Sequence, residues 1–134
     1  MLGSERIDHG LSSLEDPELT RRLAGERIPL TVCPNSNVLI ANAVPRLELH
    51  PYRRMREAGL LATLNTDDPA LTDLDLGREY HSCMEAFDYR WEDMVAIALD
   101  GVEASWLDDS DKRALRARVE REGAELATQL DPPA

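Results

Sequence analysis

The sequence has few of the residues from which the most easily identified sites are built. Its two cysteines, Cys33 and Cys83, cannot form a disulfide framework, and no Cys-x-x-Cys or His-x-His metal-binding pattern occurs. There is no glycine-rich phosphate loop, and no apolar run approaches the roughly 20 residues that a membrane-spanning helix needs. These absences argue against a disulfide-stabilised fold, a closed cysteine metal site and a phosphate-binding loop.

Positive charge is also scarce. The formal net charge is −11 and the sequence pI is about 4.6, which argues against nucleic acids and anionic membranes as partners. The first residues show no signal-peptide pattern, so we expect reduced thiols and a cytoplasmic location.

What the sequence does contain is an alternation of strand and helix patterns. With 134 residues, 43% of them hydrophobic, the chain is large enough for one modest core. Strands are predicted near Ile7, over 28–33 and over 60–65, and helices over 17–25, 52–58, 76–87, 91–99 and 111–130. Such an order predicts parallel strands joined by right-handed crossovers. Residues 131–134 are predicted to form a disordered tail.

Polar residues follow each predicted strand. His9 follows the first, the Pro34-Asn35-Ser36-Asn37 segment, predicted to be a turn, follows the second, and Asp67 and Asp68 follow the third. Because the carboxyl ends of parallel strands share one rim, we expect His9, Asn35, Ser36, Asp67 and Asp68 to approach a common mouth.

The end of the third strand is the most informative of these positions. A short apolar run of a kind buried on both faces ends in Asp67, Asp68 and Pro69. Burying a charged pair there costs several kcal/mol unless something compensates, so one carboxylate is predicted to meet a cation and the other a substrate. The alternative is a helix N-cap or an Asx-turn, which is ordinary for Asp-Asp-Pro.

The other chemically active residues allow two interpretations each. His9 is either a base or hydrogen-bond partner for a reacting water, or a histidine bonded to a loop carbonyl. His50 and His81 are interpreted as structural, because neither is spaced with another metal ligand. Cys33 is interpreted as a small buried hydrophobe rather than a nucleophile.

Taken in order, these motifs resemble the carboxyl-terminal half of the adenosine deaminase family. The resemblance runs from about Glu5 to about Glu122, and we assign residues 1–130 to a partial adenosine deaminase barrel domain. It is carried by Arg6-Ile7-Asp8-His9-Gly10, Leu30-Thr31-Val32-Cys33-Pro34-Asn35-Ser36-Asn37, His50-Pro51, Leu64-Asn65-Thr66-Asp67-Asp68-Pro69 and Glu79-Tyr80.

The resemblance implies an α/β fold, namely the carboxyl-terminal part of a TIM (β/α)8 barrel of the metallo-dependent hydrolase type. The chain would supply about strands six to eight and the terminal helices. The implied reaction is zinc-dependent hydrolysis of the 6-amino group of an adenine-type purine. By resemblance, Asp67 is the zinc ligand, Asp68 binds the purine ring, and His9 is the catalytic histidine that orients or deprotonates the attacking water.

The sequence also departs from the family. A family His-x-His, a further histidine and a proton-donating glutamate have no counterpart here, so this chain supplies one ligand to the single Zn2+ ion. We therefore expect a fragment that is inactive alone, with the amino-terminal half of the barrel as its partner. Adenosine is the favoured substrate because of Thr66 and the Glu79-Tyr80 pair, and adenine is the second candidate. A non-catalytic α/β interaction fragment is the alternative from another class.

Overall fold

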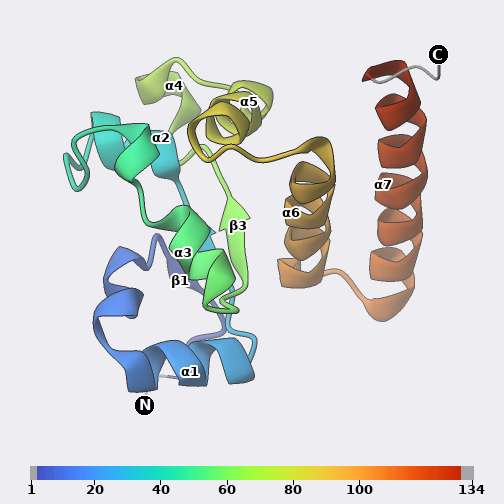
Figure 1. Cartoon of the computed structure of the whole chain (residues 1–134). Helices are drawn as coiled ribbons and strands as arrows, with labels where there is room; N and C mark the ends of the chain where they lie inside the picture. Colours follow the sequence, from blue (N-terminus) through green and yellow to red (C-terminus); the bar gives the residue numbers. More distant parts are fainter. Residues whose placement is uncertain (1–2, 131–134) are drawn as a thin grey trace.

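Three short parallel strands form the centre of the fold, with helices between and after them (Figure 1). The computed structural model describes residues 3–130, and the predicted tail at 131–134 lies outside them. The sheet order is β1-β2-β3, so each strand pairs with the next along the chain. The elements are β1 Ile7–Asp8, η1 Leu11–Glu15, α1 Pro17–Gly25, β2 Leu30–Val32, α2 Pro34–Leu39, η2 Leu47–Leu49, α3 Tyr52–Glu57, β3 Ala62–Leu64, α4 Pro69–Thr72, α5 Leu76–Ala86, α6 Trp91–Ala104 and α7 Asp109–Leu130.

The strand register sorts the side chains into two faces. Ile7 lies opposite Leu30, and Leu30 lies opposite Ala62. Side chains alternate along a strand, so the neighbouring positions form the other face. The apolar face carries Ile7, Leu30, Val32, Ala62 and Leu64, and the polar face carries Asp8, Thr31 and Thr63.

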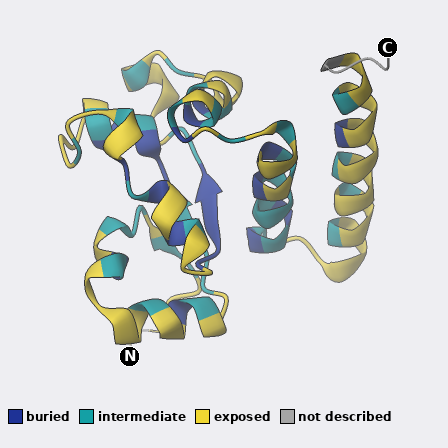
Figure 2. Cartoon of the chain, in the orientation of Figure 1, coloured by how far each residue is buried: buried dark blue, intermediate teal, exposed yellow. Residues whose placement is uncertain are grey.

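The apolar face makes the core. Helices α3, α5 and α6 contribute its largest side chains, and Figure 2 shows that β3 is buried along its length. Tyr52 and Met55 are fully buried, and the hydroxyl of Tyr52 donates to the carbonyl oxygen of Ala62 at 2.9 Å. That bond lets a tyrosine lie in the core without an unpaired polar group.

Most predicted helices are confirmed, with one clear difference in length. Asp16 caps α1 by accepting from two backbone amides, as its pattern predicted. Helix α6 was predicted to end at Leu99, but it continues to Ala104. The extension is stabilised because Arg56 donates to Asp100 at 2.6 Å and Val102 is buried. Tertiary contacts thus extend this helix beyond its predicted end.

The segment from Pro34 to Asn37 was predicted to be a turn, and that prediction is wrong. These residues open helix α2, with proline at a position where its fixed φ favours a helix start. Their side chains bond outward instead of to their own backbone, since Ser36 reaches Asp67 and Asn37 reaches His9 and His50. Helix α2 therefore supplies side chains that hydrogen-bond to residues at and behind the strand ends.

Gly10 follows the first strand under a tight steric constraint. Its φ is 71°, and a Cβ there would clash with Cδ2 of Leu30. A larger residue would disturb both the left-handed backbone and the core residue beneath it. Gly10 thus turns the chain sharply after His9.

None of the helices within residues 3–130 is both long enough and apolar enough to cross a membrane.

Candidate functional site

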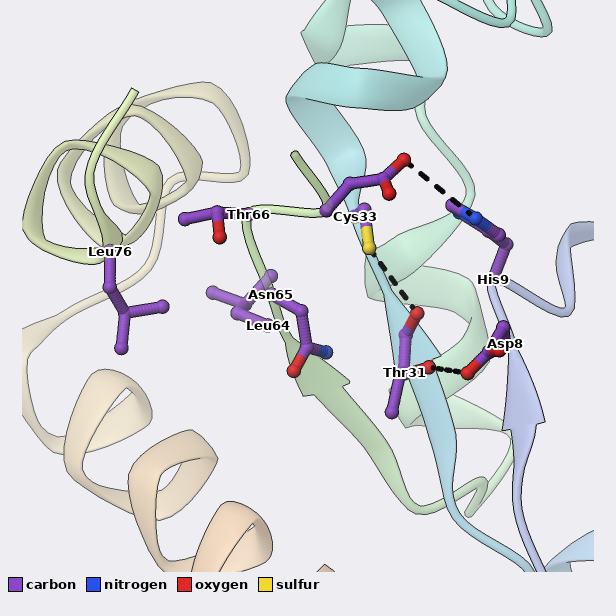
Figure 3. A pocket seen from close by; sticks show the side chains of 9 residues that line it. Asp8, His9, Thr31, Cys33, Leu64, Asn65, Thr66 and Leu76 are labelled. Atoms are coloured by element: carbon purple, nitrogen blue, oxygen red, sulfur yellow. Dashed lines mark hydrogen bonds and ion pairs between the residues drawn. The ribbon is translucent and has the colours of Figure 1, made fainter. Parts of the chain in front are cut away.

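A cavity of about 520 Å3 lies at the carboxyl ends of the three strands. Figure 3 shows Asp8 and His9 on one side, Thr31 and Cys33 in the centre, and Leu76 across the opening. The lining residues are Asp8, His9, Thr31, Cys33, Leu64, Asn65, Thr66, Asp67 and Leu76. The predicted convergence on one rim is therefore confirmed for His9 and Asp67. Asn35, Ser36 and Asp68 do not line this cavity.

Asp67 lies in a left-handed conformation with φ 63°, and its carboxylate has two close neighbours. The Ser36 hydroxyl donates to Oδ2 at 2.6 Å, and Nε2 of His9 lies 3.9 Å from the same oxygen. The side chain is 40% exposed. The expectation that the strand end buries a charged pair is therefore wrong, because the chain leaves the strand at Leu64 and turns outward before the carboxylates.

Asp68 is the N-cap of α4. Its Oδ1 accepts from the backbone amides of Ala70 at 3.1 Å and Leu71 at 3.0 Å. The capping interpretation of the Asp-Asp pair thus holds for Asp68, while Asp67 faces the cavity. The cap uses Oδ1 and leaves Oδ2 for another partner.

His9 also has a left-handed backbone, with φ 57°. Its two ring nitrogens face different residues, Asn37 and Asp67. Its Nδ1 lies 3.1 Å from Nδ2 of Asn37, so its partner is a side-chain amide and not the loop carbonyl of the alternative interpretation. Its side chain is 39% exposed, and Nε2 faces Asp67.

Behind His9 lies a buried polar pair that sequence reasoning did not identify as part of the site. Nε2 of His50 lies 3.1 Å from Oδ1 of Asn37, and both residues are buried. Burial lowers the pKa of His50 to about 4. His50 is structural, as predicted, but it contacts the residue that holds His9. The sequence signals for Asn37 were its position in the polar cluster after the second strand and its place in a motif that carries the family resemblance.

Glu79 is a fully buried carboxylate that holds the start of α2. It accepts from the backbone amide of Asn35 at 3.2 Å and from Nδ2 of Asn35 at 3.0 Å. Burial raises the pKa of Glu79, and the two bonds from Asn35 oppose that rise. The carboxylate fixes α2, the helix that carries Ser36 and Asn37. Asn35, predicted to lie at the mouth, instead faces Glu79 and Ser82.

The only group of three metal-ligating side chains found within residues 3–130 is His9, Cys33 and Asp67. Their ligand atoms all lie within 4.8 Å of one another at the cavity. Nitrogen, sulfur and carboxylate oxygen are the donors that zinc prefers, so the donor set fits this metal. Cys33 is buried as predicted, and burial together with Asp67 and Glu79 raises the pKa of its thiol to about 12. A high thiol pKa opposes metal binding at Cys33.

Comparison with known proteins places these residues in a family context. A family model described as adenosine deaminase matches residues 1–122. The chain is 44% identical over 118 residues to an adenine deaminase of Streptomyces coelicolor, covering 88% of this chain and 34% of that protein. It is 42% identical over 118 residues to an adenosine deaminase of Salmonella typhi, covering 88% and 35%. An aminodeoxyfutalosine deaminase of Streptomyces avermitilis is 40% identical over 119 residues, covering 89% and 33%.

Solved structures show the same relationship. The adenine deaminase of Arthrobacter aurescens superposes with a TM-score of 0.85 and 33% identity, covering 90% of this chain and 36% of that chain. An amidohydrolase of Burkhoderia ambifaria, crystallised with bound Zn, superposes with a TM-score of 0.86 and 31% identity, covering 96% and 36%. The chain spans about a third of the length of the curated relatives it matches.

Proposed function

Because the chain belongs to the adenosine deaminase family, we propose that it supplies part of the site of a hydrolytic deaminase that removes the 6-amino group of an adenine-type purine. Its fold is α/β and is the carboxyl-terminal part of the (β/α)8 barrel, about strands six to eight and the terminal helices. The activity, the substrate and the partner belong to a longer molecule than the chain spans, so all three are part of the proposal.

One observation carries this function most directly. The carboxylate of Asp67 and the imidazole of His9 face each other at 3.9 Å across the rim of a parallel sheet. That separation exceeds a direct hydrogen bond, and one oxygen atom lying beside the line that joins the two atoms could hydrogen-bond to both. A carboxylate and an imidazole on either side of one oxygen can orient a water molecule for attack.

The proposed site residues are those that the family resemblance implies, and the contacts around this space support them. Asp67 would hold the single Zn2+ ion, with Ser36 fixing one carboxylate oxygen by its 2.6 Å bond. When bound, zinc supplies a Lewis acid that makes water nucleophilic near neutral pH. His9 is the catalytic residue that contacts the attacking water, and Asp68 binds the purine ring through Oδ2, the oxygen that its cap does not use.

The preferred substrate is adenosine, with adenine as the second candidate. Three relatives with different substrate names lie between 40% and 44% identity, so identity alone does not choose among them. Thr66, one of the residues that favoured adenosine, lines the cavity. Glu79, from the other pair that favoured adenosine, is fully buried against Asn35, so it supports the helix behind the site and does not line the cavity.

The partner in this proposal is the amino-terminal part of the barrel. A catalytic zinc site needs about three protein ligands, and of the group His9, Cys33 and Asp67, found within the described residues, the proposal uses Asp67 alone as a ligand. The chain is therefore expected to be inactive by itself. We also propose a cytoplasmic location and no nucleic-acid or membrane partner, which the net charge of −11 supports. The alternative is a non-catalytic interaction fragment.

A chimera tests the proposal. The matching segment of the Streptomyces coelicolor adenine deaminase, 44% identical over 118 residues, is replaced by this chain. We expect the chimera to retain zinc and to deaminate adenosine or adenine, measured by purine absorbance and metal analysis. Asp67→Ala should remove both zinc and activity, whereas Asp68→Ala should keep zinc and lower turnover roughly 100-fold or more.

Asp75→Ala is the matched control for Asp68→Ala. Asp75 also caps a helix, accepting from the backbone amide of Arg78 at 2.8 Å, but it does not line the cavity. A cap loss alone should therefore leave turnover nearly unchanged. A folded, zinc-loaded chimera without deaminase activity would contradict the proposed function, and equal zinc loss in the Asp67 and Asp68 variants would contradict the assignment of their roles. Deamination by the isolated chain would contradict the proposal that the chain holds only part of the active site and is inactive by itself.

A further inference from the structure

A buried series of hydrogen bonds connects the backbone of α3 to the ring of His9. The backbone N–H of Tyr52 donates to Nδ1 of His50 at 3.1 Å. Nε2 of His50 lies 3.1 Å from Oδ1 of Asn37, and Nδ2 of Asn37 lies 3.1 Å from Nδ1 of His9. His50 is 4% exposed and Asn37 is 2% exposed, so water does not compete for these contacts.

The direction of the series follows from its first member. A backbone N–H can only donate, so Nδ1 of His50 carries a lone pair. Burial lowers the pKa of His50 to about 4, so the ring is neutral at neutral pH and has one proton. That proton must lie on Nε2, the nitrogen that faces Asn37.

The same reasoning fixes the amide of Asn37. The Nε2–H of His50 needs an acceptor, and only the amide oxygen of Asn37 can accept. The amide nitrogen therefore faces His9, and an amide nitrogen can only donate. Nδ1 of His9 consequently carries a lone pair, and the proton of the neutral ring lies on Nε2. The backbone N–H of Tyr52 thus determines the orientation of the Asn37 amide through His50.

We propose that His50 and Asn37 are positioning residues that hold His9 in the Nε2–H tautomer, so that His9 presents a hydrogen-bond donor to the cavity. Its Nε2 lies 3.9 Å from Oδ2 of Asp67, which is an acceptor. One oxygen atom between them would receive the N–H of His9 and donate to the carboxylate. The Nε2 atom of His9 then has no lone pair with which to remove a proton.

The consequence for catalysis rests on the proposed function. If the space between His9 and Asp67 holds the attacking water, His9 orients that water and does not act as its base. This narrows the role of His9, for which orientation and deprotonation were both open. The tautomer itself depends only on the buried hydrogen bonds and is independent of any activity.

Long-range 1H–15N correlation spectra of the 15N-labelled chain test the proposal, because they distinguish protonated from unprotonated ring nitrogens. At mildly alkaline pH, His9 should show a protonated Nε2 and an unprotonated Nδ1. Asn37→Asp replaces the donating amide by an acceptor of the same shape, so Nδ1 of His9 should become the protonated nitrogen. Asn42→Asp makes the same change at an exposed position and should leave the His9 signals unchanged.

A second pair of variants tests the role of His50. His50→Leu removes the donor to Asn37, so the Asn37 amide can turn over and the His9 signals should shift toward a mixture of tautomers. His50→Gln retains an N–H donor and should restore the wild-type signals. A protonated Nδ1 in wild-type His9, or unchanged signals in folded Asn37→Asp, would overturn the proposal. The wild-type spectrum alone determines the tautomer of His9, even where a variant fails to fold. An inactive chimera would contradict the proposed function but would not affect the assignment of the tautomer.

Discussion

The two faces of the three-stranded sheet contain opposite kinds of residue, although they alternate along the same strands. The apolar face packs against helices, and Leu30 and Val32 at its centre are fully buried. On the polar face, polar side chains form hydrogen bonds with one another. Thr31 donates to Asp8 at 2.6 Å and Asn65 donates to Thr63 at 2.9 Å. One face thus supplies the free energy of folding, and the other continues into the site.

This difference is unusual for parallel strands, which are normally covered by apolar packing on both faces. The polar face leads directly to the rim where His9, Cys33 and Asp67 meet. Hydrogen bonds on that face fix side-chain directions but contribute little net stability, because water offers the same bonds to the unfolded chain. Substitutions on the two faces should therefore separate stability from site geometry.

The largest contrast is expected between two adjacent residues. Leu30→Ala removes a fully buried side chain from the apolar face and should lower the free energy of unfolding by about 3 kcal/mol. Thr31→Val keeps the volume on the polar face and loses the bond to Asp8, which is exposed, so its cost should stay below about 1 kcal/mol. Urea denaturation measures both. Similar losses in the two variants would show that the faces do not divide these roles.

Acid should weaken the fold at His50, which lies behind the site and contacts Asn37 and the backbone of Tyr52. Its folded pKa is about 4, below the unfolded value of 6.5, so its contribution is complete above pH 6.5 and is lost as pH falls toward 4. The shift corresponds to about 3 kcal/mol of unfolding free energy. Glu79 acts in the opposite direction, because its folded pKa is raised and protonation favours the folded state.

The His50 contribution can be isolated by difference. Unfolding free energies of the wild type and of His50→Gln are measured across the same pH series, so that Glu79 and the surface groups cancel. The difference should shrink as the pH falls from 6.5 to 4. A constant difference would show that His50 does not remain neutral in the folded chain.

The sequence predicted the elements on the apolar face better than those at the rim. Short apolar runs located the strands, and Asp16 with Pro17 located the start of α1, because these signals are local. Helix α2 was missed because Pro34 and Asn35 favour turns in isolation, while distant Glu79 stabilises their helical form. Long-range hydrogen bonds of this kind leave no periodic pattern in the sequence.

The site was predicted in a similarly uneven way. His9 and Asp67 could be placed at one rim because both follow strands, and their order matched a family. The opposite orientations of Asp67 and Asp68 could not be predicted, because they depend on a left-handed φ of 63° at Asp67 and on the cap at Asp68. Asn37 and His50 were not connected, since their contact spans a loop whose path the sequence does not specify.

The smallest expected contrast concerns two ion pairs that link α6 to the rest of the chain. Arg56 and Asp100 are 21% and 25% exposed, so Arg56→Gln should cost about 2 kcal/mol by leaving a half-buried carboxylate poorly paired. Arg27 and Glu103 are 48% and 37% exposed, so Arg27→Gln should cost about 0.5 kcal/mol. Salt should abolish the smaller effect, because exposed pairs are screened, and leave most of the larger one. If added salt erased both effects equally, the Arg56–Asp100 pair would behave as a surface pair. Apolar packing would then be the main contribution to stability on the buried side of the sheet.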